Sequence, residues 1–207
     1  MITLGVLASG SGTNLQAILD AIAGGTLSAR IGAVVSNVAG AKALDRARTA
    51  GVPALVVDHK AYASRAEFDR ALVDVLRAHA VECVVLAGFM RIVTPVLLEA
   101  FPDRVVNVHP ALLPAFPGVN AQRQALAYGV RVTGCTVHLV DAGTDTGPIL
   151  AQASVDVLEA DTEETLKARI LSKEHELLPR VLQWIAEGRV HVAKEGPGTR
   201  HRVRIDP

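Results

Sequence analysis

The sequence predicts an α/β protein with a doubly wound, mostly parallel sheet, an antiparallel C-terminal part and a long C-terminal helix. Three observations favour this fold class. Short runs of β-branched residues alternate with amphipathic stretches through the first two thirds of the chain, which is the pattern of βαβ units. Two apolar runs beyond residue 130 have no helical pattern between them, so one of them should run antiparallel to the other strands. A long helical pattern follows both runs.

The elements of the first two thirds can be placed by their start and stop signals. Ser64-Arg-Ala-Glu67 is a capping box that opens a helix. Thr94 followed by Pro95 predicts a capped short helix, and Gly51 ends an earlier helix. The strands are expected over 2–8, 31–36, 54–57, 82–87 and 104–109, and the helices over 14–23, 41–50, about 64–80 and from 95 onward.

In the last third of the chain, strands and helices no longer alternate. Asp161-Thr-Glu-Glu164 opens a helix that continues to about Glu187. Pro179 should kink this helix, and Gly188 should end it. The strands expected around it cover 131–140, 149–157 and 189–193.

Two stretches carry no predicted element. No helix or strand is predicted between residues 110 and 130, and the basic tail over 200–204 is expected to be a solvated end. The sequence has no internal repeat, no low-complexity segment and no linker. We therefore expect one domain, either undivided or in two lobes.

Composition excludes several functional classes. Half of the 207 residues are apolar, and the 21 Lys and Arg balance the 21 Asp and Glu, so nothing requires a nucleic acid or an acidic membrane as partner. No apolar run approaches the roughly 18 residues of a membrane span, and the N-terminus lacks the charged segment of a signal peptide. Cys83 and Cys135 lie in apolar runs and are expected to be buried free thiols. These features predict a cytoplasmic protein.

A glycine-rich loop, Ser9-Gly-Ser-Gly-Thr-Asn14, lies between the first strand and the first helix. Glycines let the chain turn tightly, and the amides at a helix start favour an anion, so this loop can hold a phosphate. It is not a dinucleotide motif, because Leu15 replaces the third glycine and Ser36-Asn37 ends the second strand without an acidic residue. A plain tight turn is an equally good interpretation of this loop taken alone.

Asn107 and His109 are two residues apart in a predicted strand that Pro110 ends. Because alternate residues of a strand share a face, the amide and the imidazole should project together from the carboxyl end of the strand, where open α/β sheets bind ligands. For a lone histidine, a hydrogen-bonded structural role is the more frequent case. The companion Asn107 favours a functional pair.

An acidic loop, Asp141-Ala-Gly-Thr-Asp145-Thr-Gly-Pro148, joins the two apolar strands of the last third. A metal site is one interpretation of this loop, and a solvated turn is the more frequent one. Nearby, His138 shares a strand face with Thr136; it either supports the same site or is a half-buried structural side chain. No set of Cys and His residues has the spacing of a zinc site, so no metal is predicted.

Four stretches together resemble the phosphoribosylglycinamide formyltransferases, a family of folate-dependent enzymes. Asn-Val-His-Pro-Ala-Leu-Leu-Pro at 107–114 is similar to the pattern of the wider formyltransferase group. Ser-Gly-Ser-Gly-Thr-Asn-Leu-Gln at 9–16 and Leu-Ala-Gly-Phe-Met-Arg-Ile at 86–92 narrow the resemblance to this family, and Asp-Thr-Gly-Pro-Ile at 145–149 adds to it. The resemblance covers nearly the whole chain.

The resemblance implies a reaction, its substrates and a fold. The formyl group of 10-formyltetrahydrofolate would pass to the amine of 5-phosphoribosylglycinamide (glycinamide ribonucleotide), giving formylglycinamide ribonucleotide and tetrahydrofolate in purine biosynthesis. No metal would be required, and a homodimer is compatible with the sequence. The implied fold is a single Rossmann-like formyltransferase domain over 1–207, with its nucleotide-binding part over about 1–100 and its folate and catalytic part over about 101–207.

The family also implies roles for residues that match its motifs. Asn107 and a protonated His109 would contact the formyl oxygen, and Asp145 would raise the pKa of His109, as a nearby carboxylate does. The substrate would be bound by the backbone of Gly12, Thr13 and Asn14 at its phosphate and by Glu174 at its glycinamide end. The folate pocket would be lined by Arg65, Met90, Arg91, Ile92, Val93, Asn107, Asp141, Ala142, Gly143, Thr144 and Asp145.

One stretch departs from the family pattern. After Pro117-Gly118 the family often has histidines, and this chain has Asn120 and Gln122 there. That puts in doubt any supporting role for histidines in this segment. The three residues of the expected catalytic group are intact.

Other functional classes share only part of these features. A formyltransferase acting on charged initiator tRNA usually carries a further C-terminal domain and a basic surface, and a formyl-folate hydrolase usually carries an N-terminal regulatory domain; neither is expected here. A non-catalytic nucleotide-binding module would not need the polar residues at 107, 109 and 145 together. A nicotinamide oxidoreductase would need the dinucleotide features that the glycine-rich loop lacks.

Overall fold

The computed structural model describes residues 1–193 and 201–207, and its contacts divide the chain into two compact units, Met1–Asn107 and Val108–Pro207. Strand β5 (Val105–His109) begins in the first unit and ends in the second. Arg200, the first residue of the basic tail, lies outside the described residues. No helix in the described part of the chain is long and apolar enough to cross a membrane.

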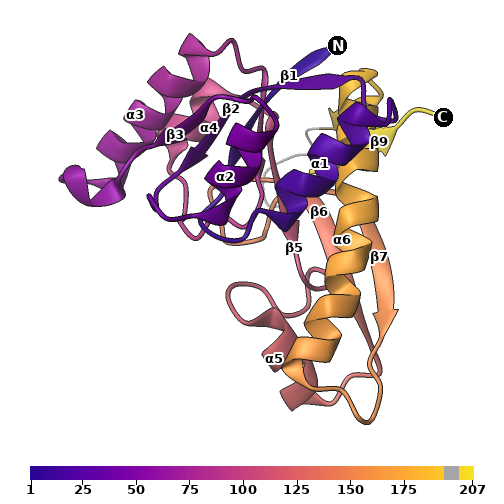
Figure 1. The fold of residues 1–207 in the computed structure, drawn as a ribbon. Helices are drawn as coiled ribbons and strands as arrows, with labels where there is room; N and C mark the ends of the chain where they lie inside the picture. Colours follow the sequence, from indigo (N-terminus) through magenta and orange to yellow (C-terminus); the bar gives the residue numbers. More distant parts are fainter. Residues whose placement is uncertain (194–200) are drawn as a thin grey trace. The chain divides into compact units, whose positions relative to one another are not determined.

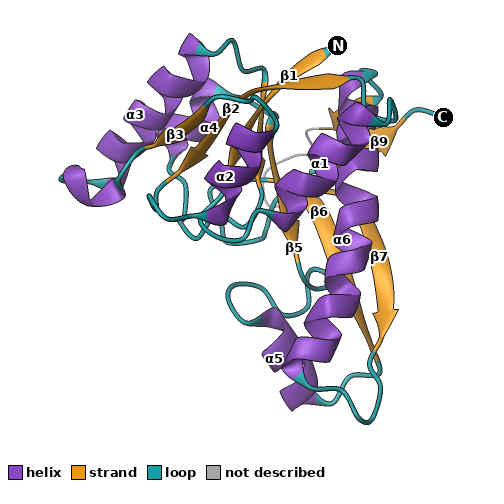
Figure 2. Cartoon of the chain, in the orientation of Figure 1, coloured by secondary structure: helices purple, strands orange, loops and turns teal. Residues whose placement is uncertain are grey.

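The first unit is built on a parallel sheet with the strand order β3-β2-β1-β4-β5 (Figures 1 and 2). The side chains of Leu4, Val6, Val34 and Val85 in this sheet are fully buried. The other strands are β1 (Ile2–Leu7), β2 (Ala29–Ser36), β3 (Ala54–Val56) and β4 (Cys83–Leu86), and the helices are α1 (Thr13–Ala23), α2 (Lys42–Thr49), the 3₁₀ turn η1 (His59–Ala61), α3 (Arg65–Ala78) and α4 (Pro95–Ala100).

The strand order fixes where this sheet binds ligands. The chain moves outward from β1 to β3 and then returns to place β4 on the other side of β1. Because parallel crossovers are right-handed, this reversal places α3 and α4 on the face opposite α1 and α2. The sheet therefore has its topological switch point between β1 and β4, and the loops after these two strands are the expected ligand loops.

The second unit combines an antiparallel hairpin with a long helix. Strand β6 (Val132–Leu139) pairs with β7 (Ile149–Asp156), and α6 (Glu163–Ala186) packs along both of them (Figure 1). Helix α5 (Ala121–Tyr128) contacts α6, and β8 (Val190–Ala193) pairs with β9 (Arg202–Ile205). The predicted class of a mostly parallel sheet with an antiparallel C-terminal part and a long helix is confirmed.

Several local predictions are confirmed and others need correction. The Ser64 side chain accepts from the Glu67 amide at the start of α3, and Pro95 occupies the first turn of α4, but the Thr94 side chain makes no capping hydrogen bond. The long helix begins within the predicted segment 161–164, where Thr162 is the N-cap and forms a reciprocal capping box with Thr165. It continues through Pro179 as a single helix, and Gly188 follows its end with φ +72°.

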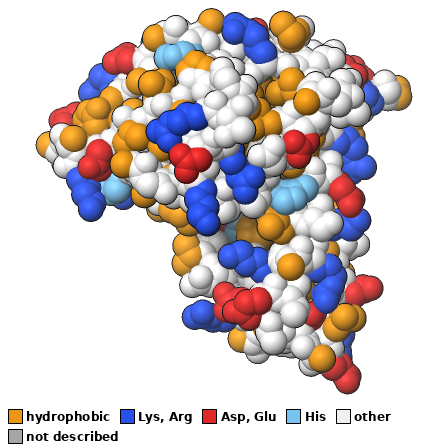
Figure 3. Space-filling view, in the orientation of Figure 1, with side chains coloured by type: hydrophobic (Ala, Val, Ile, Leu, Met, Phe, Trp, Pro, Cys, Tyr) orange, Lys and Arg blue, Asp and Glu red, His pale blue; other side chains and the backbone are white. Residues whose placement is uncertain are grey.

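Two elements of the second unit were not predicted. Helix α5 lies in the stretch without a predicted element, and residues 202–204 of the expected solvated tail belong to β9, in which Arg202 and Arg204 are exposed. The two cysteines are free and buried, as predicted, and burial raises the pKa of Cys83 and of Cys135 to about 12 each. On the face drawn in Figure 3, acidic and basic side chains are interspersed, in keeping with the zero net charge.

Candidate active site

The glycine-rich loop turns the chain from β1 into α1. Gly12, the residue before α1, has φ +69°, and a Cβ there would lie 2.6 Å from the Cα of Ala43 in α2. The Ala43 amide also donates to the Gly10 carbonyl at 3.1 Å. Only glycine fits this close approach. The first amides of α1, at Thr13 and Asn14, therefore begin directly after a turn that α2 holds in place.

Hydrogen bonds join the loops at the switch point of the first unit. The Ser9 amide donates to the Gly88 carbonyl at 3.0 Å, and the Ser9 hydroxyl accepts from the Met90 amide at 2.9 Å. The same hydroxyl donates to Oδ1 of the buried Asn37 at 2.6 Å, and Nδ2 of Asn37 lies 3.3 Å from Nδ1 of His59. The loop after β1 is thus fixed to the loops after β2 and β4.

The loop over 88–94 presents apolar side chains and is held at its far end by a buried acid. Met90 and Ile92 are 70% and 59% exposed, whereas Val93 is buried. Oδ2 of Asp69, a buried residue of α3, accepts from the Thr94 amide at 2.5 Å.

Two arginines lie close enough to Asp69 to affect its pKa, and one of them is Arg65, a residue predicted for the folate pocket. Burial raises the pKa of Asp69, and the charges of Arg65 and Arg91 act in the opposite direction. The structure therefore brings Arg65, on α3, close to the same acid that anchors the 88–94 loop.

In the second unit, two buried histidines converge on one carboxylate. Nδ1 of His109 lies 3.4 Å from Oδ2 of Asp145, and Nε2 of His138 lies 3.6 Å from Oδ1 of the same residue. The Gly118 amide donates to Oδ2 of Asp145 at 2.7 Å. Nε2 of His109 donates to the Phe116 carbonyl at 2.8 Å. His138 therefore does approach the predicted catalytic pair.

These contacts set the charge on Asp145. Burial acts to raise the pKa of Asp145, but hydrogen bonds from His138 and Gly118 act against burial, and the pKa is lowered overall. Asp145 is therefore a carboxylate at neutral pH.

The charge on His109 in the unliganded site depends on opposing effects. Burial lowers the pKa of His109, whereas Asp145 and the Phe116 carbonyl act to raise it, and the pKa is lowered overall. Asp145 thus acts in the predicted direction, and the ring is neutral in the unliganded site. A carbonyl can only accept, so the proton of the neutral ring lies on Nε2, toward Phe116.

The acidic loop is ordered by its own first residue. Oδ1 of Asp141 accepts from the Gly143 amide at 3.0 Å and from the Thr146 hydroxyl at 2.6 Å. Ala142, Gly143 and Thr144 are exposed at its tip. Asp145 adopts a left-handed backbone with φ +55°, which is uncommon outside glycine and frequent at functional sites. A turn built by Asp141 thus presents Asp145 to the two histidines.

The remaining predicted residues are placed separately in the two units. Asn107 is half-buried in β5, two residues before His109. Glu174 is buried on α6, and its charge acts on Cys135 of β6. Among the described residues, no three His, Cys, Asp or Glu side chains are grouped so as to hold a metal ion.

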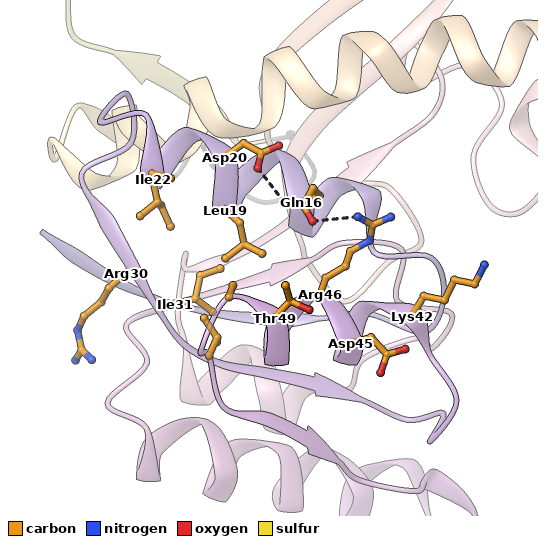
Figure 4. A pocket seen from close by; sticks show the side chains of 13 residues that line it. Gln16, Leu19, Asp20, Ile22, Arg30, Ile31, Lys42, Asp45, Arg46 and Thr49 are labelled. Atoms are coloured by element: carbon orange, nitrogen blue, oxygen red, sulfur yellow. Dashed lines mark hydrogen bonds between the residues drawn. The ribbon is translucent and has the colours of Figure 1, made fainter.

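A pocket of about 930 Å³ in the first unit lies elsewhere, along α1, α2 and the start of β2 (Figure 4). Its wall includes Leu19, Ile31 and Val52, and Figure 4 shows Arg46 reaching across its rim to Gln16. Of the described residues that line it, none is predicted for the site.

Sequence reasoning missed several groups that shape the site. The Phe116 carbonyl and the Gly118 amide are backbone groups, so no side-chain pattern could have indicated them. Asn37 and Asp69 are buried side chains. The signal for Asp69 was an acidic residue next to Phe68 and on the same helical side as Leu72, where an apolar residue is expected.

Comparisons with known proteins agree with this geometry. The formyl transferase family model matches residues 3–182. Phosphoribosylglycinamide formyltransferase of Bacillus subtilis is 42% identical over 178 residues, covering 86% of this chain and 91% of that protein. Trifunctional purine biosynthetic protein adenosine-3 of Gallus gallus is 46% identical over 195 residues, which are 94% of this chain and 19% of that protein.

A solved structure of this family is similar to the chain over almost its whole length. Glycinamide ribonucleotide transformylase 1 from Symbiobacterium toebii shares 55% identity with a TM-score of 0.94, covering 99% of this chain and 94% of that one. The chain thus spans nearly all of the single-function relatives and 19% of the length of the trifunctional relative.

Proposed function

The chain belongs to the formyl transferase family and, within it, to the phosphoribosylglycinamide formyltransferases; from this we propose that it transfers the formyl group of 10-formyltetrahydrofolate to the amine of glycinamide ribonucleotide. The products are formylglycinamide ribonucleotide and tetrahydrofolate. The observation that carries the proposal is the convergence of two buried histidines on Asp145 at the end of the strand that also bears Asn107.

The reaction requires stabilisation of an oxyanion. The substrate amine attacks the formyl carbon, and the tetrahedral intermediate carries its negative charge on the former formyl oxygen. Donors aimed at that oxygen stabilise the transition state more than the ground state. The side-chain amide of Asn107 donates to that oxygen in this proposal. Nε2 of His109 donates to it as well, with its N–H shared between the Phe116 carbonyl and the oxyanion, because Nδ1 faces Asp145.

His109 can gain a proton as the reaction proceeds. In the unliganded site burial disfavours the imidazolium, and Asp145 offsets part of that effect. A negative charge developing on the formyl oxygen acts on His109 in the same direction as Asp145 and favours its protonation. The attacking amine must release a proton, so the reaction supplies one. Asp145, which stays a carboxylate, stabilises the charged ring.

Each substrate has its own loops in this proposal. The phosphate of the nucleotide is held by the amides of Gly12, Thr13 and Asn14, supported by the turn that only glycine fits at position 12. Glu174 contacts the glycinamide end. The folate is bound by the 90–93 segment with Arg65 and by the 141–145 loop, and the protein acts without a bound metal, as a cytoplasmic enzyme.

Incubating the purified protein with 10-formyltetrahydrofolate, with and without glycinamide ribonucleotide, tests the function. Mass spectrometry of the nucleotide should show the added formyl group, and tetrahydrofolate should form only when the nucleotide is present. Folate turnover that ignores the nucleotide would instead identify a hydrolase. Formylation of charged initiator tRNA in place of the nucleotide would identify the tRNA-directed class.

A further inference from the structure

One short loop in the second unit touches both His109 and Asp145 of the proposed site. The Phe116 carbonyl accepts from Nε2 of His109 at 2.8 Å, and the Gly118 amide donates to Oδ2 of Asp145 at 2.7 Å. These two bonds decide which ring nitrogen of His109 carries the proton and how the carboxylate of Asp145 is oriented. The position of the 116–119 loop therefore controls the geometry of the pair.

The loop does not hold its conformation by local preference. Phe116 has φ +54°, in the left-handed region that a bulky residue rarely adopts, and Gly118 has φ +80°. A strained backbone of this kind persists only where surrounding groups over-determine it. Contacts from another element must fix the loop.

Helix α5 supplies those contacts. Nε2 of Gln124 donates to the Pro117 carbonyl at 3.2 Å and to the Val119 carbonyl at 2.9 Å, which are the carbonyls of the residues on either side of Gly118. A primary amide has two N–H donors, so both are used on the loop. At the other end of α5, the Tyr128 ring packs edge-on against the Phe116 ring, with centroids 6.0 Å apart.

We propose that Gln124 is a positioning residue for formyl transfer: by bridging the carbonyls of Pro117 and Val119, it holds the Phe116 carbonyl on His109 and the Gly118 amide on Asp145. This inference rests on the proposed function. In the bonds described, Gln124 itself touches neither His109 nor Asp145. It acts through the loop, on the tautomer of His109 and on the hydrogen bonding of Asp145.

The ring nitrogen that carries the proton gives a readout independent of activity. While the Phe116 carbonyl faces Nε2, the neutral ring keeps its proton there and presents an unprotonated Nδ1 to Asp145. If the loop is released, the neutral ring gains by moving the proton to Nδ1, where Asp145 accepts it. The charged and titratable groups facing the ring are Asp145 and His138, and neither is changed in this test.

The test replaces the amide by a side chain of similar length without donors, Gln124→Met, and uses Arg123→Met as the matched control. Arg123 is the preceding residue of α5, is 69% exposed and pairs only with Glu163 among its described contacts. A surface pair of this kind contributes little to stability. Gln124→Glu, whose carboxylate cannot donate to carbonyls, is the second variant if Gln124→Met does not fold.

Two measurements are made on each protein. The ¹⁵N shifts of histidine-labelled protein without substrates, at about pH 8, report the tautomer of the neutral His109, which is assigned by its loss in His109→Gln. Steady-state formyl transfer gives kcat and both KM values. Gln124→Met should move the His109 proton from Nε2 to Nδ1 and lower kcat about ten- to hundred-fold with little change in KM. Arg123→Met should keep the wild-type tautomer and kcat.

An unchanged tautomer in both Gln124 variants overturns the inference, whatever happens to kcat, because any loss of rate would then not act through the loop. A moved proton with an unchanged kcat also overturns it, because the loop would not matter to the reaction. Failure of the proposed function looks different: the wild-type protein itself would not formylate the nucleotide, while the tautomer would still show whether Gln124 holds the loop.

Discussion

His109 faces an acceptor on each ring nitrogen, yet burial keeps it neutral in the free protein. The Phe116 carbonyl and Asp145 both act to raise its pKa, and desolvation exceeds their combined effect. A group balanced in this way responds strongly to one further negative charge, because that charge is poorly screened at a buried position. The balance suits a side chain that must become charged during a reaction and return to neutrality afterwards.

Asp145→Asn tests this balance. Removing the carboxylate removes one of the two effects that raise the pKa of His109, so the NMR titration midpoint of His109 should fall below that of the wild-type protein. The kcat of formyl transfer should fall about 10²- to 10³-fold, comparable with the loss of an oxyanion donor. A midpoint that rises would contradict the assigned role of Asp145.

The combined change His109→Ala with Asp145→Asn should cost little more than the worse single change, because the two residues act as one unit. Multiplicative losses in kcat would show that Asp145 has an effect separate from the histidine. Asn107→Ala serves as the comparison, since it removes the other proposed donor while leaving the pair intact.

Asp69 shows the opposite balance. Its pKa is raised by burial despite the charges of Arg65 and Arg91, so its ionisation costs free energy on folding. An acid whose folded pKa lies above its unfolded pKa lowers stability as the pH rises through those values. The ionised carboxylate of Asp69 therefore lowers the stability of the folded chain. It lies next to the loop that is proposed to bind folate.

Asp69→Asn should separate stability from function. The amide oxygen can still accept from the Thr94 amide, so Tm at pH 7 should rise above the wild-type value, and the gain should disappear at acid pH, where Asp69 is protonated. The KM for folate should increase several-fold, because Arg65 and Arg91 lose the charge that orients them, while the KM for the nucleotide stays the same. A lower Tm at pH 7 would contradict this account.

At the scale of elements, local signals predicted most of the fold. Alternation of β-branched and amphipathic runs located β1 to β5 and the α-helices between them, because all of these elements except β3 contribute buried side chains. Helix α5 was missed because its eight residues lie between Asn120 and Gly129, both in left-handed conformations, and follow no strong period. Strand β9 was missed because it forms by pairing with β8, from Val190 with Ile205 to Ala193 with Arg202, and a short run of four residues gives no signal for such a pairing.

For the proposed site, the sequence pointed to the side chains but not to the backbone groups that contact them. The polar side chains at 107, 109 and 145 stood out by position and motif, whereas the loop that holds two of them acts through backbone atoms. Asn120, which stands where the family often has histidine, occupies a left-handed position with φ +57°. Asparagine tolerates that conformation, as histidine does, so the departure from the family pattern leaves the backbone there undisturbed.

The turn from β1 into α1 makes a prediction at the scale of elements. In Gly12→Ala the new Cβ meets the α2 backbone at 2.6 Å in a left-handed conformation, so the turn must shift. Stability should fall by about 2 kcal/mol, and the KM for the nucleotide should rise more than that for folate.

Gly10→Ala is the matched control for this turn, because a Cβ at Gly10 has no neighbour within 4 Å among the described residues. It should leave Tm and both KM values close to the wild-type values. If both alanine variants raised the two KM values equally, the loop would not be specific to the nucleotide.

At the scale of the whole molecule, residues proposed for the site are distributed over both compact units. The division falls at Asn107, within β5, so this strand carries one proposed oxyanion donor on each side of the division. The proposed phosphate loop belongs to the first unit, and Asp145 and Glu174 belong to the second. With no net charge, the molecule has little long-range attraction for an anionic substrate, so recognition depends on the local groups of each loop.

Ligand-induced shifts of Tm should therefore separate the two substrates. A ligand at 100 times its Kd stabilises the folded chain by about 2.7 kcal/mol, which raises Tm by roughly 5–11 °C for a chain of this size. Glycinamide ribonucleotide and a folate analogue should each raise the Tm of the wild-type protein. At the same ligand concentrations, Gly12→Ala should lose most of the nucleotide shift and keep the folate shift, whereas Asp69→Asn should reduce the folate shift and keep the nucleotide shift. Gly10→Ala should keep both. If each variant lost both shifts together, the two substrates would not be recognised by separate loops, and the assignment of phosphate to the β1–α1 turn and of folate to the 88–94 loop would be wrong.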